Sequence, residues 1–140
     1  MHNELPLKVQ IIVFRKIAND LQVLLLKRSP EDGGFWNTVV GTLELNESII
    51  ECRSRELREE AGIEHVVEWS DELYRFTFPK KDYLVSVLVY AAEVTPEQEV
   101  TLNVEHTEYE WVEARQAVEK VEKENVKECI KRFITYSKLD

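Results

Sequence analysis

One amphipathic helix, with capping residues at both ends, divides a chain that otherwise consists mainly of strand-like segments. Ser48 followed three residues later by Glu51 is the capping-box pattern that begins a helix, and Gly62 occupies the position just after a helix end where a left-handed residue is favoured. We therefore predict a helix over residues 48–61. At about 100° per residue, its core face carries Ile50, Ser54, Leu57 and Ala61.

Segments rich in Val, Ile and Leu lie on both sides of this helix. Residues 8–15 and 21–28 flank the turn-forming pair Asn19-Asp20, so they predict a β-hairpin. The order of strands, helix, strands and helix predicts a mixed sheet sandwiched between helices, an α/β (α+β) fold. The other predicted strands are 35–40, 66–78, 83–94 and 108–112, with a turn at 79–82, and the other predicted helices are 114–121 and 126–136.

The length and composition fit one compact domain over residues 1–140. The chain is 44% hydrophobic and 32% charged, long enough to bury a core and too short for two ordinary domains. Eighteen Lys and Arg against 27 Asp and Glu leave a formal charge of −9, and no basic run offsets it. Because a general nucleic-acid binder needs a basic footprint, that class is disfavoured.

Several sequence features bear on location. No apolar run approaches the roughly 20 residues that a membrane span needs, and the start, Met1 to Glu4, has neither the basic nor the apolar segment of a signal peptide. Cys52 and Cys129 are too few and too far apart to suggest a disulfide framework or a zinc site. We therefore expect a cytoplasmic protein with reduced thiols and no membrane partner.

Three carboxylates gather on one side of the predicted helix. Glu56, Glu59 and Glu60 fall at i, i+3 and i+4, so they repel one another unless arginines or a hard divalent metal neutralise them. Arg55 lies four residues before Glu59, and charged helix faces are usually only solvated. The helix alone therefore favours a salt-bridged surface over a metal site.

The wider spacing around these carboxylates favours the metal site. The chain resembles the Nudix family at every fixed position of its signature, a match expected by chance about once in 10⁹ starting points. The resemblance implies the Nudix fold over nearly the whole chain, and a loop-helix-loop site in which Mg²⁺, or possible Mn²⁺, lies between helix carboxylates and a substrate diphosphate. The matching pattern is Gly41, five residues, Glu47, seven residues, Arg55-Glu56-Leu57, one residue, Glu59-Glu60, one residue, and Gly62-Ile63.

The same resemblance implies roles for individual residues. Glu56 and Glu60 bind the metal, with Glu59 as a third ligand or an outer partner. Glu47 and Arg55 brace them, Arg55 through charge-assisted hydrogen bonds that hold a carboxylate in place.

Three local segments, 26–28, 35–42 and 104–111, look like one branch of the family, the dihydroneopterin triphosphate pyrophosphatases, which are often labelled dATP pyrophosphohydrolases. The chain departs from that branch in two places. Glu124-Asn125 stands where a Ser-Asn pair is expected, and the segment 78–83 is shorter.

The branch resemblance implies further site residues. Glu105 joins the metal site as a ligand from a separate segment, and Arg28 binds the substrate. Val40 occupies a substrate-contacting position where the branch has Thr, and Gly41, which has no Cβ, lets its backbone turn sharply and a carbonyl approach the metal. The general base is one of the three carboxylates Glu56, Glu59 and Glu105.

For other charged and aromatic residues near the signature, we expect ordinary structural roles. Lys8 and Lys27 are expected on solvated strand edges, where lysines guard a sheet against aggregation. Aromatics in strands are more often core than ligand-binding. The four that could instead stack on a base or pterin ring are Trp36, Phe76, Phe78 and Tyr83.

We therefore predict a metal-dependent pyrophosphohydrolase that converts a nucleoside triphosphate or dihydroneopterin triphosphate to a monophosphate and pyrophosphate. A nucleotide-binding sensor without turnover is one alternative, although a pure binder has no need for so repulsive a cluster. An RNA 5′-pyrophosphohydrolase is another, and the −9 charge counts against it unless a local groove overrides it. The sequence leaves open the physiological substrate, the phosphorus attacked, and whether the protein is a monomer or a homodimer.

Overall fold

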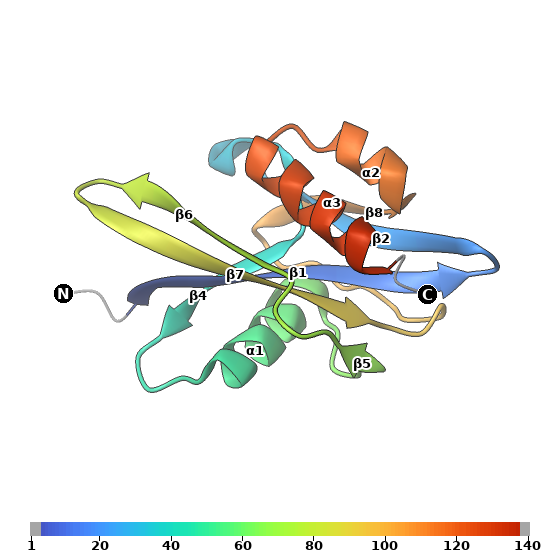
Figure 1. Ribbon diagram of the computed structural model, residues 1–140, viewed down its shortest axis with the longest axis horizontal. Helices are drawn as coiled ribbons and strands as arrows, with labels where there is room; N and C mark the ends of the chain where they lie inside the picture. The colour runs from blue at the N-terminus through green and yellow to red at the C-terminus, as the bar shows by residue number, and fades with distance from the viewer. Residues whose placement is uncertain (1–3, 138–140) are drawn as a thin grey trace.

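An eight-stranded mixed sheet with helices on both faces forms the centre of the computed structural model, which describes residues 4–137 (Figure 1). This architecture confirms the predicted α+β sandwich. The strands are β1 (Glu4–Ile17), β2 (Asp20–Arg28), β3 (Trp36–Asn37), β4 (Val39–Glu44), β5 (Glu68–Trp69), β6 (Tyr74–Lys80), β7 (Tyr83–Glu93) and β8 (His106–Glu113), and the helices are the 3₁₀ turn η1 (Pro30–Asp32), α1 (Ile49–Ala61), α2 (Ala114–Lys120) and α3 (Glu124–Ser137).

The sheet has the strand order β3-β2-β1-β7-β5, with β4 also paired to β1, β6 to β7 and β8 to β2. β1 is antiparallel to β2 and β4 and parallel to β7. In Figure 1, α1 lies on one face of the sheet while α2 and α3 lie over the other. A separate group of buried side chains joins each helical layer to the sheet.

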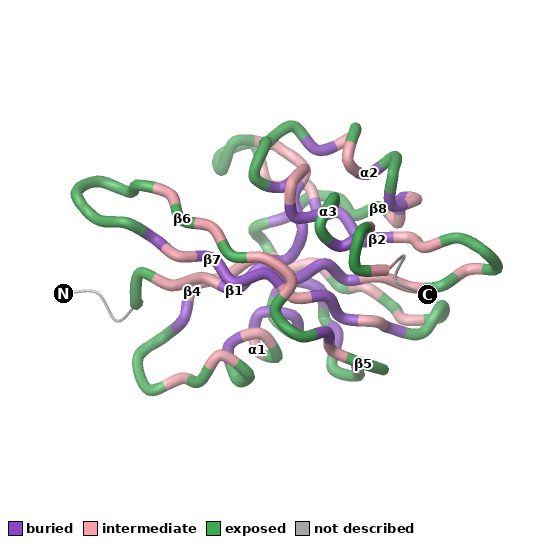
Figure 2. The backbone as a smooth tube through the Cα atoms, in the orientation of Figure 1, coloured by how far each residue is buried: buried purple, intermediate pink, exposed green. Residues whose placement is uncertain are grey.

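The central segment of β1 is buried on both faces, as the tube in Figure 2 also shows. Val9, Ile11 and Val13 pack on the α1 side, whereas Ile12 packs on the α2 and α3 side. Gln10 is the one polar residue in this run, and its side chain is only 4% exposed. Because neighbouring side chains of a strand point to opposite faces, Gln10 shares the face of Ile12.

The helix predicted over residues 48–61 is confirmed as α1, and its predicted core face is half right. Ser48 and Glu51 form the capping box, and Gly62 ends the helix in the left-handed conformation. Leu57 and Ala61 are buried as predicted, whereas Ile50 is 64% exposed and Ser54 is exposed. Cys52 is completely buried. The helix is rotated because Cys52, together with the two buried carboxylates described below, packs against the sheet.

Two predicted strands are interrupted in the structure. The segment 35–40 divides at Thr38, whose backbone N–H donates to the side chain of Asn37, and β4 then continues to Glu44. The segment 66–78 contains β5 and β6, separated by a stretch that still donates backbone hydrogen bonds to β7 from Ser70 and Leu73. β6 also includes Pro79, which was predicted as turn; a proline can lie there because β6 is an edge strand.

Within residues 4–137, no helix is long and apolar enough to cross a membrane. Residues 1–3, on which most of the signal-peptide expectation depends, lie outside the described residues.

Candidate active site around the buried carboxylates of α1

A cavity of about 680 Å³ lies beside α1, β4 and the beginning of α3. All the residues that the sequence analysis assigned to catalysis, substrate binding or metal binding line this cavity. They come from β2, β4, α1 and the segment before β8, and they are Arg28, Val40, Gly41, Arg55, Glu56, Glu59, Glu60 and Glu105.

Arg55 organises the acidic side of the cavity. Its Nε and Nη2 donate to the two carboxylate oxygens of Glu47 at 2.5 and 3.0 Å, a bidentate pair. Its Nη1 donates to Glu56 Oε1 at 2.6 Å and to Glu59 Oε1 at 3.1 Å, and its Nη2 also donates to the Thr42 carbonyl at 3.0 Å. The hydrogen bonds from Arg55 lower the pKa of Glu47 to about 2. Arg55 therefore holds three carboxylates in fixed positions.

Glu56 and Glu60 form a buried carboxyl pair. They are 7% and 3% exposed, and their side chains hydrogen-bond to each other. Burial raises the pKa of both groups, and in Glu60 the adjacent Glu56 and the charge of Glu105 raise it further. The backbone N–H of Val40 donates to Glu60 Oε1 at 3.4 Å, which ties this carboxyl to β4.

Gly41 provides the space for Glu56. A Cβ built at Gly41 would overlap the carboxyl group of Glu56. Gly41 lies in β4, paired with Val9, and is not among the residues with positive φ. The expectation that it permits a sharp turn is therefore wrong: a glycine is needed here because a carboxylate packs directly against the strand.

The third acidic segment lies at the rim. Glu105, directly before β8, has its Oε1 3.9 Å from Nη1 of Arg28, whose Nη2 is 3.5 Å from Asp32. The buried ring of His106 contacts Asn103 Oδ1 through Nδ1 at 3.2 Å, and its Nε2 is 4.0 Å from Glu60 Oε1. Burial and the Arg28 charge lower the pKa of His106 to about 4, so the ring is neutral at pH 7.

The structure also adds residues that the sequence analysis missed or placed elsewhere. Lys8 lines the cavity and donates to Thr42 Oγ1 at 3.0 Å, so the expectation of a solvated edge is wrong for it. Gln10, Asn37 and Lys123 line the cavity as well. The sequence does carry a signal for Gln10, since it is a polar residue within the otherwise apolar run 9–13, where a buried polar side chain can be expected.

Among the aromatics, Phe76 and Phe78 line the cavity, as does Phe35. Trp36 instead lies under the ammonium groups of Lys120 and Lys27, and Lys27 itself pairs with Glu108 at 3.8 Å. Tyr83 is 42% exposed and is not part of the cavity lining. Two of the four aromatics considered for ring stacking are therefore in position for it.

The cavity residues suit a hard divalent cation. Such a cation takes oxygen ligands. The raised pKa values of the buried carboxyl pair show that the nearby positive charges do not offset the cost of ionising both groups. Among residues 4–137, no group of three or more His, Cys, Asp or Glu side chains already converges around a metal position. In this structure the Arg55 guanidinium donates to Glu47, Glu56 and Glu59.

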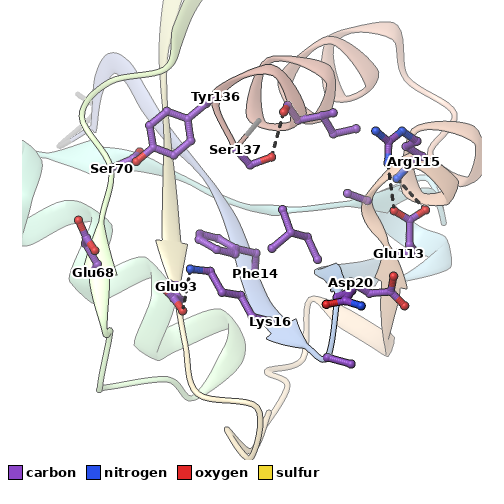
Figure 3. A pocket seen from close by; sticks show the side chains of 15 residues that line it. Phe14, Lys16, Asp20, Glu68, Ser70, Glu93, Glu113, Arg115, Tyr136 and Ser137 are labelled. Atoms are coloured by element: carbon purple, nitrogen blue, oxygen red, sulfur yellow. Dashed lines mark hydrogen bonds and ion pairs between the residues drawn. The ribbon is translucent and has the colours of Figure 1, made fainter. Parts of the chain in front are cut away.

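A second hollow, of about 780 Å³, lies around the β1–β2 turn and the end of α3 (Figure 3). Its charged side chains are largely paired with one another, Lys16 with Glu93 at 3.9 Å and Arg115 with Glu113 at 4.0 Å. It holds none of the predicted site residues. We therefore take the smaller cavity, which contains the buried carboxyl pair, as the candidate active site.

Comparison with known proteins establishes the family. The chain matches the NUDIX domain over residues 6–133. It is 37% identical over 128 residues to an octanoyltransferase of Myxococcus xanthus, covering 89% of this chain but only 35% of that protein. It is 30% identical over 140 residues to the dihydroneopterin triphosphate diphosphatase of Haemophilus influenzae, covering 90% and 85% of the two chains. The chain therefore belongs to the NUDIX domain family.

The structure of a C. elegans Ap4A hydrolase supports the same fold, with a TM-score of 0.81, 22% identity and coverage of 94% and 96%. The predicted family, fold and hydrolase class are thus confirmed, as is the predicted likeness to dihydroneopterin triphosphate pyrophosphatases. The chain spans about a third of the length of the Myxococcus relative, so the activity of that whole protein is not assigned to it.

Proposed function

We propose that this protein is a divalent-metal-dependent pyrophosphohydrolase that splits a diphosphate linkage in a nucleoside triphosphate-like molecule, giving a monophosphate and pyrophosphate. The observation that carries the proposal is the buried Glu56–Glu60 pair, which Arg55 flanks on one side. Two adjacent buried carboxyl groups are costly, and a bound cation would offset that cost. The name of the Haemophilus relative supports a triphosphate substrate.

Glu56 and Glu60 would hold Mg²⁺ or Mn²⁺, with Glu59 and Glu105 completing the site from its rim. When bound, such a metal neutralises phosphate oxygens and lowers the pKa of a water molecule that attacks phosphorus. The chain's own cations complement it: Arg28 and Lys8 both line the cavity and would attract phosphate oxygens.

Two of the three candidate bases can pass a proton to solvent. The side chains of Glu59 and Glu105 are 52% and 50% exposed, whereas Glu56 is enclosed by Arg55 and Glu60. A base must accept a proton from water and then release it. We therefore place the general base at Glu59 or Glu105 and give Glu56 to metal binding.

A product assay tests the proposed function. The purified protein is incubated with Mg²⁺ and, in separate reactions, with nucleoside and deoxynucleoside triphosphates, dihydroneopterin triphosphate, a dinucleoside polyphosphate, ADP-ribose and a 5′-triphosphate oligonucleotide. We expect pyrophosphate release from a free triphosphate and none after addition of EDTA. Ligand affinity without any hydrolysis would support the sensor alternative, and preference for the oligonucleotide would support RNA end processing.

A further inference from the structure

A buried amide pair in the wall of the cavity has no part in the proposed hydrolysis. Gln10 and Asn37 are 4% and 8% exposed, and both line the cavity. Gln10 Nε2 donates to Asn37 Oδ1 at 3.1 Å and to Thr38 Oγ1 at 2.9 Å. Because buried polar groups are costly without partners, such a network fixes the direction of each amide.

The polarity of the two amides follows from one backbone contact. The N–H of Thr38 donates to Asn37 Oδ1 at 2.8 Å, and a backbone N–H can only donate, so the atom it contacts is the amide oxygen. The Gln10 atom facing that oxygen must then be its NH₂ group. Gln10 Oε1 and Asn37 Nδ2 remain, and neither has a hydrogen-bond partner among residues 4–137.

Apolar side chains line the same cavity. Phe76 pairs with Val87 across β6 and β7, and Val87 pairs with Lys8 of β1, so these three side chains share one face of the sheet. Val126, at the start of α3, also lines the cavity. Apolar walls combined with a few fixed polar atoms are typical of a site for a planar ring.

The amide pair is directly linked to the carboxylates. Gln10 is paired with Val40 across β1 and β4, and the Val40 N–H donates to Glu60 at 3.4 Å. A ligand whose phosphates bind a metal at Glu60 can therefore place its ring against Gln10 in the same cavity.

We infer that Gln10 and Asn37 recognise the heteroaromatic ring of the substrate, Gln10 Oε1 as hydrogen-bond acceptor and Asn37 Nδ2 as donor. The inner atoms of the two amides bond to each other, so the free acceptor and donor are the outer atoms of the pair. A ring that presents a hydrogen-bond donor to Gln10 Oε1 and an acceptor to Asn37 Nδ2 complements this pair, and the edges of purine, pteridine and pyrimidine rings carry such groups. The inference rests on the proposed function, since it names the residues that bind the substrate ring in the same site.

The first test uses the wild-type protein with Mg²⁺. We expect kcat/KM for the preferred ring-bearing triphosphate to exceed that for inorganic tripolyphosphate, which has no ring, by at least about 10-fold, the size of an unpaired buried polar group. The panel contains dATP, dGTP, dCTP, dTTP and dihydroneopterin triphosphate. A kcat/KM for tripolyphosphate equal to that of every ring-bearing substrate would overturn the inference.

The second test changes one donor. Asn37→Asp keeps the oxygen that accepts from Thr38 and Gln10 but replaces the free donor by an acceptor. We expect kcat/KM for the preferred ring-bearing substrate to fall about 10- to 100-fold, mainly through KM, and the fall in kcat/KM for tripolyphosphate to be at least about 10-fold smaller. Asn19→Asp, the same change in the exposed β1–β2 turn, is the matched control. Equal losses with both substrates would overturn the inference.

Two further measurements keep these outcomes separate. If a melting experiment shows that Asn37→Asp does not fold, Gln10→Met replaces it. This variant removes the other amide, and we expect the same selective loss of kcat/KM. If the wild-type protein hydrolyses nothing, the proposed function fails by itself. Equilibrium binding of dATP to the wild-type protein and to Asn37→Asp in the presence of Ca²⁺ then decides the inference: weaker binding to the variant supports it, and equal binding overturns it.

Discussion

Glu60 is the residue at which burial and proposed chemistry coincide. Burial and the neighbouring Glu56 hold its pKa above the ordinary value, and Glu60→Gln removes the charge while keeping the shape. We expect turnover at saturating substrate to fall at least about 100-fold, with the fold intact. At neutral pH the metal-free variant should melt at a higher temperature, because folding no longer has to protonate and bury a carboxylate beside Glu56. Glu64→Gln changes an exposed glutamate just after α1 and is the control; near-wild-type turnover in Glu60→Gln would remove Glu60 from the metal site.

The Glu47–Arg55 pair makes a separate, pH-dependent prediction. The pKa of Glu47 is lowered to about 2 from 4.5, chiefly by hydrogen bonds from Arg55, and its side chain is only 11% exposed. A lowered folded-state pKa stabilises the protein above the unfolded value, and the stabilisation is lost as pH falls from about 4.5 to about 2. Glu47→Gln should therefore lower the free energy of unfolding by about 3 kcal/mol at pH 7.

Denaturant unfolding of wild type and Glu47→Gln at several pH values measures this difference. The two proteins should become nearly equally stable toward pH 2, because Glu47 is then fully protonated in the unfolded state and about half protonated in the folded state. A difference that stays constant from pH 7 to pH 3 would show that the charge of Glu47 contributes nothing.

At the scale of elements, α1 shows both the reach and the limit of prediction from sequence. Ser48, Glu51 and Gly62 act through local backbone bonds, so the helix ends could be predicted within one residue. The buried face could be predicted only in part: Leu57 and Ala61 are buried as expected, but hydrophobicity favours Ile50 over Glu56 and Glu60 as a core residue. Burying a carboxylate depends on Arg55, Gly41 and strand β4, which come together only in the folded chain.

The packing of α1 on β4 predicts the effect of one methyl group. In Gly41→Ala the new Cβ would overlap the Glu56 carboxyl, so either the side chain or the helix must move. We expect a loss of about 1–3 kcal/mol in unfolding free energy and a fall of at least about 10-fold in turnover. In a Glu56→Ala background the same substitution should cost much less stability, since the overlapping atoms are gone. Equal costs in both backgrounds, measured by denaturant unfolding, would contradict this contact.

At the scale of the whole molecule, strand alternation and helix caps predict the two helical layers, and the signature places the carboxylates. The composition of the cavity depends on longer-range pairing. Lys8 and Gln10 come from the first strand, Phe76 from the sixth and Val126 from the last helix, and the parallel pairing of β1 with β7 brings the first three together. Neither the hydrophobic pattern nor the signature contains this register, so Lys8, Gln10 and Val126 could not be assigned to the cavity from sequence, whereas Phe76 was already one of four aromatic candidates.

The stability of the whole fold should respond to metal in a pH-dependent way. The pKa of Glu60 is raised from 4.5 to about 10, so between these pH values the folded state binds more protons than the unfolded state. The free energy of unfolding of the metal-free protein therefore falls as pH rises from 4.5 to about 10. A metal displaces that proton, and its stabilisation should therefore grow with pH. At a fixed concentration of about 100 times the Kd at pH 8, Mg²⁺ or Mn²⁺ should add about 2.7 kcal/mol at that pH, raising Tm by about 10 °C, and clearly less at pH 5. Thermal melting with metal and then with excess EDTA measures this shift in Tm. In Glu60→Gln the metal-induced shift should no longer depend on pH. A shift of equal size at both pH values, or one that Glu60→Gln retains in full, would contradict metal binding at the buried pair.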